Sequence, residues 1–265
     1  MQESEGFRGA IFDVDGVLVD SPHEEAWREG LKSLMENEWA DIREQTSYSP
    51  EKFTPEVYQA KMSGLPRYDG ARAALEYFEV PDVEERVQEY GDSKQKMIID
   101  LIEAGEFYAY PDALRFILAV KDAGIKIGAA SSSKNANAFL ERVFLDKFVE
   151  EDGLDYDFVT SGYTLLDILD ANVSGRDFEQ GKPHPMIFQT AAEELGTGPE
   201  ESFVIEDAAN GVQAAKAGEM AALGLARADD EAALAEAGAD VVVTTLDDIS
   251  LEALEEGRLE KSNSL

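Results

Sequence analysis

The sequence predicts an α/β fold: a doubly wound parallel sheet into which an all-helical domain is inserted. A short apolar run, Ala10–Phe12, ends abruptly in Asp13, Asp15 and Gly16, as a buried strand does where it gives way to a tight loop. Residues 22–108 then show helical spacing, and apolar strands alternate with helices only after them. Because such alternation is typical of parallel sheets, the first strand belongs with the C-terminal half of the chain.

The domain boundaries follow from where the helical pattern starts and stops. We expect residues 1–21 and 109–255 to form a Rossmann-like core, residues 22–108 a helical cap domain and residues 256–265 a solvated tail. The insertion follows the first strand directly, so the cap is expected to cover the carboxyl edge of the sheet as a lid.

The helical block opens at a helix start signal, Asp20–His23. Trp27, Leu31, Leu34 and Met35 follow at the spacing of one helix face, which predicts a helix packed in a small bundle. Turn signals divide the rest of the block at Ser49-Pro50, Thr54-Pro55, Gly64-Leu65-Pro66 and Val80-Pro81.

Strands and helices alternate after the block. Tyr110–Asp112 is expected to act as a hinge into a helix over Ala113–Ala123. Apolar runs bounded by turn signals then predict the remaining strands. These candidate strands are Lys126–Ala130, Asp157–Thr160, Ser202–Ile205, Met220–Leu225 and Val241–Val243.

Two acids at the end of the first strand need an explanation. Ligands of open parallel sheets bind beyond the carboxyl ends of the strands, which would place Asp13 and Asp15 at a functional edge. A turn in which Asp15-Gly16 only reverses the chain accounts for this loop equally well by itself. A calcium loop is disfavoured, because the Asp/Asn spacing and distant Glu of an EF-hand are absent from the sequence.

Two later strand ends also carry polar groups. The run to Ala130 leads into Ser131–Asn135, whose backbone N–H groups and following helix start favour an anion such as phosphate. Capping of that helix is the alternative. The run Ser202–Ile205 ends in Glu206 and Asp207, oxygen ligands of the kind that Mg²⁺ selects, and a helix N-cap pair is the alternative.

A lysine lies in a third loop, at Gly181-Lys182-Pro183, before a predicted helix over Met186–Leu195. No GxxxxGK[ST] pattern surrounds it, so it is not part of a P-loop. By itself, such a lysine would be a surface charge.

The charge balance restricts the partners. The chain has 56 acidic and 23 basic residues, a formal net charge of −33. Such a surface repels nucleic acids and anionic membranes, so we expect neither as a partner. It also repels itself, and molar salt shortens the screening length to about 3 Å. Acids spread along the whole chain are therefore expected of a halophilic protein in a salt-rich cytoplasm.

The sequence also restricts location and redox chemistry. It contains no apolar run as long as a membrane span, and its N-terminus lacks the features of a signal peptide, which predicts a cytoplasmic protein. It contains no cysteine, which excludes disulfides and thiol catalysis. No pattern indicates an oligomeric state.

Taken together, in this order and at this spacing, the four motifs resemble those of the haloacid-dehalogenase-like hydrolase superfamily. The resemblance covers nearly the whole chain, and the helical insertion is similar to that of the helical-cap subgroup. The stretches most similar to the β-phosphoglucomutase-like branch are Tyr110–Asp112, Ser131-Ser132-Ser133-Lys134-Asn135, Gly181-Lys182-Pro183 and Ile205-Glu206-Asp207.

The resemblance implies a mechanism. Asp13 would attack phosphorus and form an aspartyl-phosphate, and Asp15 would protonate the leaving oxygen and then deprotonate the acceptor. Ser131 and Lys182 would hold the phosphoryl oxygens.

The resemblance also implies a cofactor, Mg²⁺. The Asp13 carboxylate, the Asp15 carbonyl and Asp207 would bind it, with Glu206 nearby.

A small phosphorylated molecule, a sugar phosphate, is the substrate that the resemblance implies. In the mutases of this branch, residues like Arg67, Ser133, Lys134 and Asn135 hold the distal phosphate of a sugar bisphosphate, and Ser132 in the same loop would also bind substrate.

His23 corresponds to a histidine that helps the mutases delay hydrolysis until the sugar arrives, and it would also contact substrate. The segment before it, Asp20-Ser21-Pro22, is shorter than the mutase pattern. The alternative for His23 is an N-terminal helix residue without a catalytic task.

These observations predict a Mg²⁺-dependent phosphatase that hydrolyses a sugar phosphate. A β-phosphoglucomutase is the enzymatic alternative, since both reactions use the same core residues. A catalytically silent binding protein on the same fold is the alternative from another class, and the intact Asp13, Asp15, Lys182 and Asp207 argue against it.

Overall fold

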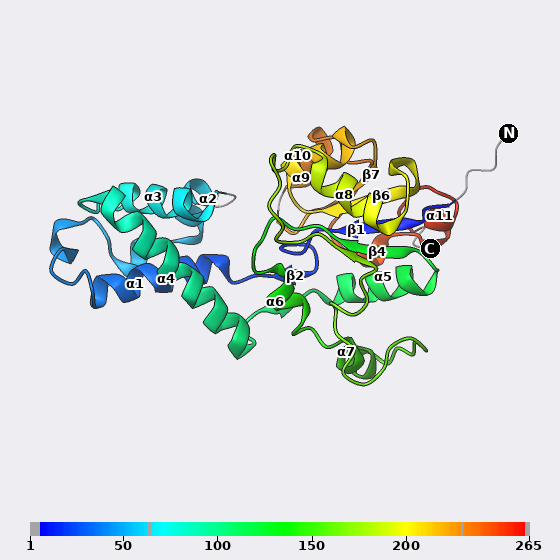
Figure 1. Ribbon diagram of the computed structural model, residues 1–265, viewed down its shortest axis with the longest axis horizontal. Helices are drawn as coiled ribbons and strands as arrows, with labels where there is room; N and C mark the ends of the chain where they lie inside the picture. The colour runs from blue at the N-terminus through cyan, green and yellow to red at the C-terminus, as the bar shows by residue number, and fades with distance from the viewer. Residues whose placement is uncertain (1–5, 63–64, 229, 263–265) are drawn as a thin grey trace. The chain divides into compact units, whose positions relative to one another are not determined.

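The computed structural model describes residues 6–62, 65–228 and 230–262 (Figure 1). No helix among these residues is long and apolar enough to cross a membrane.

The described residues form two compact units. The core unit contains the residues up to Ser21 and those from Tyr108 onward, and the helical unit is Pro22–Phe107. Two short antiparallel strands of the core unit, β2 (Val19–Asp20) and β3 (Tyr108–Ala109), adjoin the points where the chain passes between the units.

A six-stranded parallel sheet forms the centre of the core unit, which confirms the predicted α/β class. Its strand order is β5–β4–β1–β6–β7–β8, and every neighbouring pair is parallel. The first strand therefore lies in the middle of the sheet. In sheet order, the strands are β5 (Ala171–Asn172), β4 (Lys126–Ala129), β1 (Gly9–Phe12), β6 (Ser202–Glu206), β7 (Ala221–Leu225) and β8 (Val241–Val243).

The helices of the core unit are α5 (Pro111–Asp122), α6 (Ala136–Leu140), α7 (Leu145–Asp152), α8 (Met186–Leu195), α9 (Ala209–Ala217), α10 (Glu231–Glu236) and α11 (Leu251–Glu255), with 3₁₀ turns η3 (Pro199–Glu201) and η4 (Leu246–Asp248). Figure 1 shows α8 and α9 on one face of the sheet and α5 on the other.

Both faces of β1 are buried. Successive side chains of a strand point to opposite faces, and Ile11 packs in a cluster with residues of α8 and α9. Its neighbour Phe12 instead lies edge-on to Phe116 of α5, with 6.1 Å between the ring centroids. A strand covered on both sides is apolar without alternation, which explains the run at Ala10–Phe12.

One predicted strand is wrong. Asp157–Thr160 forms a turn, in which Val159 N donates to Tyr156 O at 3.0 Å. The edge strand beside β4 is β5, in which Ala171 is buried at 8% exposure; Val173, directly after the strand, is buried at 0%. The prediction failed because a two-residue edge strand has almost no recognisable sequence pattern. Asp157–Thr160, by contrast, contains the adjacent apolar residues Phe158 and Val159, which are typical of a short strand.

The end of the chain is hydrogen-bonded to the core unit. Ser250 N donates to Glu260 O at 3.0 Å, and Ser262 N donates to Asp248 O at 2.6 Å. The expected tail (256–265) is thus hydrogen-bonded up to Ser262, although its side chains are mostly exposed. The last three residues lie outside the described residues.

Every regular element among the described residues of the helical unit is a helix. The elements are α1 (His23–Glu36), η1 (Arg43–Gln45), η2 (Pro50–Lys52), α2 (Pro55–Lys61), α3 (Arg67–Tyr77) and α4 (Val83–Ala104). Gly64, in the turn predicted before α3, lies outside the described residues.

The helical unit has its own apolar core, formed mainly between α1, α3 and α4. The predicted stripe of α1, from Trp27 to Met35, is buried within it. Tyr90 of α4 meets Trp27 edge-to-face at 5.0 Å and donates from its hydroxyl to Trp27 O at 2.9 Å. A buried tyrosine hydroxyl with a backbone partner fixes the position of α4 against α1.

Candidate active site

Three strand ends meet at one edge of the sheet. β1 is hydrogen-bonded to β4 on one side and to β6 on the other. Asp13 after β1, Ser131 after β4, and Glu206 and Asp207 at the end of β6 are therefore brought together, as expected for a functional edge of a parallel sheet.

The loop after β1, Asp13–Val19, is tight and is called the aspartate loop below. Gly16 N donates to Val19 O at 2.8 Å, which closes it. Gly16 has a φ of +81°, and a Cβ there would lie 1.8 Å from Asp207 Oδ2. Only glycine fits both the left-handed backbone and the close approach of a neighbouring carboxylate.

Lys182 lies in the loop before α8 and joins two acids. Its Nζ donates to Asp13 Oδ1 at 2.7 Å and to Glu206 Oε1 at 2.5 Å, and its side chain is 9% exposed. Burial alone would lower the pKa of Lys182, but the charges of Asp13 and Glu206 outweigh it and raise this pKa. Lys182 is therefore a buried cation and not the surface charge that the isolated motif suggested.

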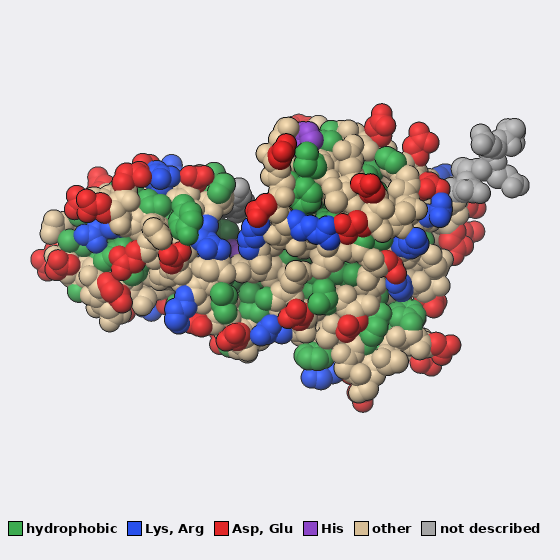
Figure 2. All heavy atoms as spheres, in the orientation of Figure 1, with side chains coloured by type: hydrophobic (Ala, Val, Ile, Leu, Met, Phe, Trp, Pro, Cys, Tyr) green, Lys and Arg blue, Asp and Glu red, His purple; other side chains and the backbone are tan. Residues whose placement is uncertain are grey.

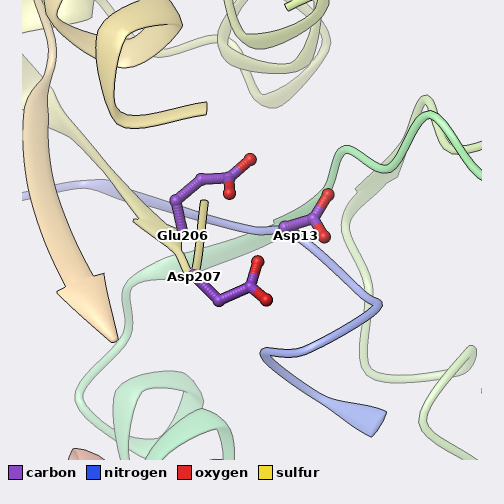
Figure 3. Close-up of side chains that lie close together, drawn as sticks. All are labelled: Asp13, Glu206 and Asp207. Atoms are coloured by element: carbon purple, nitrogen blue, oxygen red, sulfur yellow. The ribbon is translucent and has the colours of Figure 1, made fainter. Parts of the chain in front are cut away.

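The carboxylates of Asp13, Glu206 and Asp207 form a cluster, with ligand oxygens within 4.8 Å of one another (Figure 3). Burial raises the pKa of all three carboxyls, and repulsion from neighbouring carboxylates adds to this rise. A cation among these oxygens would offset the repulsion. An all-oxygen donor set is the one that Mg²⁺ takes, so the residues fit the predicted cofactor.

Ser131 links the loop after β4 to the aspartate loop. Its Oγ donates to Asp15 Oδ2 at 3.4 Å and accepts from Ser133 N at 3.1 Å. Its own N–H donates to Ser174 Oγ at 3.2 Å. Ser131 is thus placed beside the predicted acid–base residue, and Ser174 is a supporting contact that the motifs did not reveal.

The other predicted phosphate-loop residues occupy different environments. Lys134 Nζ donates to Gly175 O at 2.7 Å and to Asp177 Oδ1 at 2.6 Å, which holds this exposed lysine to the loop after β5. Asn135 is buried, whereas Ser132 is exposed. The structure therefore ties Lys134 to a neighbouring acid of the core unit.

His23 and Lys94 form a pair within the helical unit. Lys94 Nζ lies 3.1 Å from His23 Nδ1, and since an ammonium only donates, Nδ1 accepts and the imidazole is neutral. Burial, with the Lys94 charge, lowers the pKa of His23 to about 3. Lys94 was not predicted, although a lysine between Tyr90 and Ile98 in the buried stripe of α4 is a detectable signal.

Arg67 begins α3 and bonds to a neutral amide. Its NH2 donates to Gln95 Oε1 at 2.5 Å, and its guanidinium carbon lies 6.0 Å from the centre of the Tyr68 ring. No carboxylate in the described part of the chain pairs with it. In so acidic a protein, this leaves the Arg67 charge available to an anion.

Similarity to known proteins agrees with this geometry. Residues 7–219 match the family described as haloacid dehalogenase-like hydrolase. A beta-phosphoglucomutase of Mycobacterium bovis is 33% identical over 258 residues, 91% of each chain. A phosphorylated carbohydrates phosphatase of Thermotoga maritima is 29% identical over 238 residues, 88% of this chain and 92% of that one. The crystal structure of a beta-phosphoglucomutase from a Pyrococcus species matches with a TM-score of 0.68 at 28% identity, covering 94% of this chain and 97% of that one.

Proposed function

The chain belongs to the haloacid dehalogenase-like hydrolase family and is thus an enzyme of phosphoryl transfer or hydrolysis; from this we propose a Mg²⁺-dependent phosphomutase that acts on a sugar phosphate through Asp13. This proposal moves the phosphatase, which the sequence motifs favoured, to second place. The relatives supply the reason, and the bond between Lys182 and Asp13 is the observation that carries the chemistry.

Lys182 makes Asp13 a usable nucleophile. A cation 2.7 Å from Asp13 Oδ1 favours the carboxylate over the acid, against the burial that raises the pKa of this group. An ammonium has three donors, and two are used by Asp13 and Glu206, so the third is available to a phosphoryl oxygen. An anionic nucleophile beside a phosphate donor is the arrangement that in-line attack on phosphorus requires.

The proposed reaction has two transfers. First, a carboxylate oxygen of Asp13 attacks phosphorus, the bond from phosphorus to the sugar oxygen breaks, and Asp15 protonates that oxygen. Then a different sugar hydroxyl attacks the phosphoryl group on Asp13, and Asp15 takes its proton. Ser131, whose Oγ lies 3.4 Å from Asp15 Oδ2, orients the carboxyl that moves both protons.

We assign Mg²⁺ to the Asp13 carboxylate, the Asp15 carbonyl and Asp207, with Glu206 beside them. When bound, the ion supplies positive charge that offsets the repulsion between these carboxylates and an incoming phosphate. The raised pKa values of Asp13, Glu206 and Asp207 support this assignment, since burial and repulsion between the carboxylates disfavour their charged forms when no cation is present.

Two features favour a sugar hydroxyl over water as the acceptor. Relatives that match over 91% of the chain are named beta-phosphoglucomutase. In the helical unit, Arg67 has a charge available for a second phosphate, and His23 is a neutral imidazole whose Nδ1 accepts from Lys94, despite the shorter segment before it. A phosphatase with the same substrates is the second candidate, because the Thermotoga maritima relative is named as one.

A product assay separates the two candidates. The enzyme is given β-glucose 1-phosphate and a trace of glucose 1,6-bisphosphate, in molar KCl with Mg²⁺. We expect glucose 6-phosphate to form without inorganic phosphate. Inorganic phosphate released at the rate of substrate loss would show the phosphatase instead, and no turnover of this sugar would call for other phosphate esters.

Arg67 should affect only substrates with a second phosphate. Arg67→Ala removes a charged hydrogen bond of the kind worth about 1.5–3 kcal/mol, so turnover of the sugar bisphosphate should fall about tenfold or more. Turnover of a small aryl phosphate should stay within about twofold. Arg72→Ala is the matched control, since Arg72 lies on the same helix but pairs with Glu84 and Asp69. Equal losses on both substrates would contradict the distal role.

A further inference from the structure

Arg227 follows β7 and is held by an anchor of the core unit. Its guanidinium donates to both oxygens of Asp112, at 3.0 and 3.1 Å, and its central carbon lies 3.8 Å from the centre of the Tyr110 ring. Asp112 also accepts from Thr245 Oγ1 at 3.1 Å and from Leu246 N at 2.9 Å. Two donors in a planar fork, a stacked ring and a fixed carboxylate allow this guanidinium few orientations.

The same guanidinium reaches the aspartate loop. Its Nε lies 3.3 Å from Gly16 O and its NH2 lies 3.2 Å from Val17 O, so it donates to two consecutive carbonyls. Gly16 is also the residue whose α-carbon lies so close to Asp207 that a Cβ would meet its carboxylate. A small shift of Gly16 would therefore displace Asp207 of the carboxylate cluster and the adjacent Asp15.

An ion pair this buried is a poor device for stability alone. The Arg227 and Asp112 side chains are 18% and 10% exposed, and the cost of removing two charges from water offsets much of their attraction. Apolar side chains of similar size would join the same elements. Apolar side chains would not, however, donate hydrogen bonds to Gly16 O and Val17 O.

We propose that Arg227 is a positioning residue, which holds the aspartate loop so that Asp13 and Asp15 meet the substrate in the reactive geometry. The catalytic role of the aspartate loop rests on the proposed function, whereas the contact between Arg227 and the loop does not. The positioning role predicts two separable effects of Arg227→Gln: a more mobile aspartate loop and a slower chemical step.

Hydrogen exchange measures the first effect without substrate or metal. In Arg227→Gln, the amides of peptides spanning residues 12–20 should exchange at least tenfold faster, while peptides from β4 and β7 keep the wild-type rate. Unchanged exchange at residues 12–20, or equal acceleration in every peptide, would overturn the positioning role.

Steady-state kinetics on a small aryl phosphate measure the second effect, since this probe needs the aspartate loop but not a particular sugar. We expect kcat to fall at least tenfold with KM within twofold of wild type. A wild-type kcat in Arg227→Gln would overturn the inference. If wild-type protein turned over neither this probe nor a sugar phosphate, the proposed function would fail, and hydrogen exchange would still decide the role of Arg227.

Two variants separate positioning from a structural role. Arg115→Gln is the matched control, because Arg115 is also an arginine of the core unit held by acids, here Asp247 and Asp152, but makes no hydrogen bond to the aspartate loop among the described residues. It should keep the wild-type kcat and loop exchange. Arg227→Lys keeps the charge near Asp112 but not the planar fork, so the melting temperature should recover while kcat stays low. Full recovery of kcat in Arg227→Lys would overturn the inference.

Discussion

Lys182 is the residue on which the charge balance of the site depends. It is the cation bonded to Asp13 and Glu206, and both partners are almost completely buried. Removing one member of a buried ion pair leaves an uncompensated charge, which typically costs about 3–5 kcal/mol. The lysine therefore contributes to the stability of the site and to its chemistry at the same time.

Asp13→Asn should remove turnover and spare the fold. An amide cannot form the phosphoryl intermediate, so kcat on β-glucose 1-phosphate should fall by about a thousandfold or more. Lys182 keeps its bond to Glu206, so the melting temperature should stay within about 3 °C of wild type. A variant that keeps a tenth of the wild-type rate would contradict the nucleophile assignment.

His23 should make the protein sensitive to mild acid. Its pKa is about 3 in the folded chain and 6.5 in the unfolded chain, so between these values the unfolded state binds the extra proton. Stability from this group is complete above pH 6.5 and is lost as pH falls, by about 2 kcal/mol from pH 7 to pH 5.

Urea unfolding at pH 7 and pH 5 measures this effect. His23→Gln should lose about 2 kcal/mol less than wild type over that range. The other histidine gives the matched control, His184→Gln, which should keep the wild-type loss because His184 lies in the core unit, outside the His23–Lys94 pair. The same loss in His23→Gln as in wild type would show that His23 is not held neutral.

At the scale of elements, the junction between β1 and the aspartate loop places the acids. The strand is buried on both faces and is flanked by β4 and β6, so its end cannot move without the other two. The loop then turns through Gly16, which approaches Asp207 more closely than any other residue type allows. Strand pairing therefore places Asp13 at the edge of the sheet, and Gly16 allows the loop after it to lie close to Asp207.

Gly16→Ala should reduce both stability and turnover. The left-handed backbone costs an alanine about 1–2 kcal/mol, and the added Cβ must also displace Asp207. Gly124→Ala is the matched control, with a φ of +79° and no atom within 4 Å of the new Cβ. Thermal melts should show a loss in both variants, and only Gly16→Ala should lose kcat, by at least tenfold. Wild-type kcat in Gly16→Ala would show that the close approach to Asp207 is dispensable.

At the scale of the whole molecule, the excess of acids dominates. Figure 2 shows Asp and Glu side chains spread over the visible surface of both units. Many basic side chains already pair with acids, as Arg72 does with Glu84 and Arg176 with Glu194. Because the chain has 56 acids and only 23 bases, a large excess of negative charge remains, and these charges repel one another.

The melting temperature should therefore rise with salt. Between low ionic strength and molar KCl, screening should raise it by about 5 °C or more. A variant with Glu36→Gln, Glu38→Gln and Asp41→Asn, three exposed positions at the end of α1, should show a smaller rise. A melting temperature that does not respond to KCl would contradict the halophilic interpretation of the charge.

Some features of this protein follow from the sequence by itself, because they depend on local patterns. Apolar runs that end in polar residues identified β1, β4 and β6, and with them Asp13, Ser131, Glu206 and Asp207. The period of α1 correctly predicted its buried stripe. These patterns are visible in the sequence because a strand buried on two faces, or a helix buried on one, requires apolar residues at fixed positions.

Other features were decided only by the tertiary structure, because they depend on residues far apart in the chain. Lys182 meets Asp13 across 169 positions, and Arg227 meets Gly16 across 211. The local sequence around Lys182 or Arg227 does not indicate which residue it will contact. The two-residue strand β5 is likewise defined only by its pairing with β4. Sheet pairing brings distant strand ends to one edge, and only there do a lone lysine and a lone arginine acquire their partners.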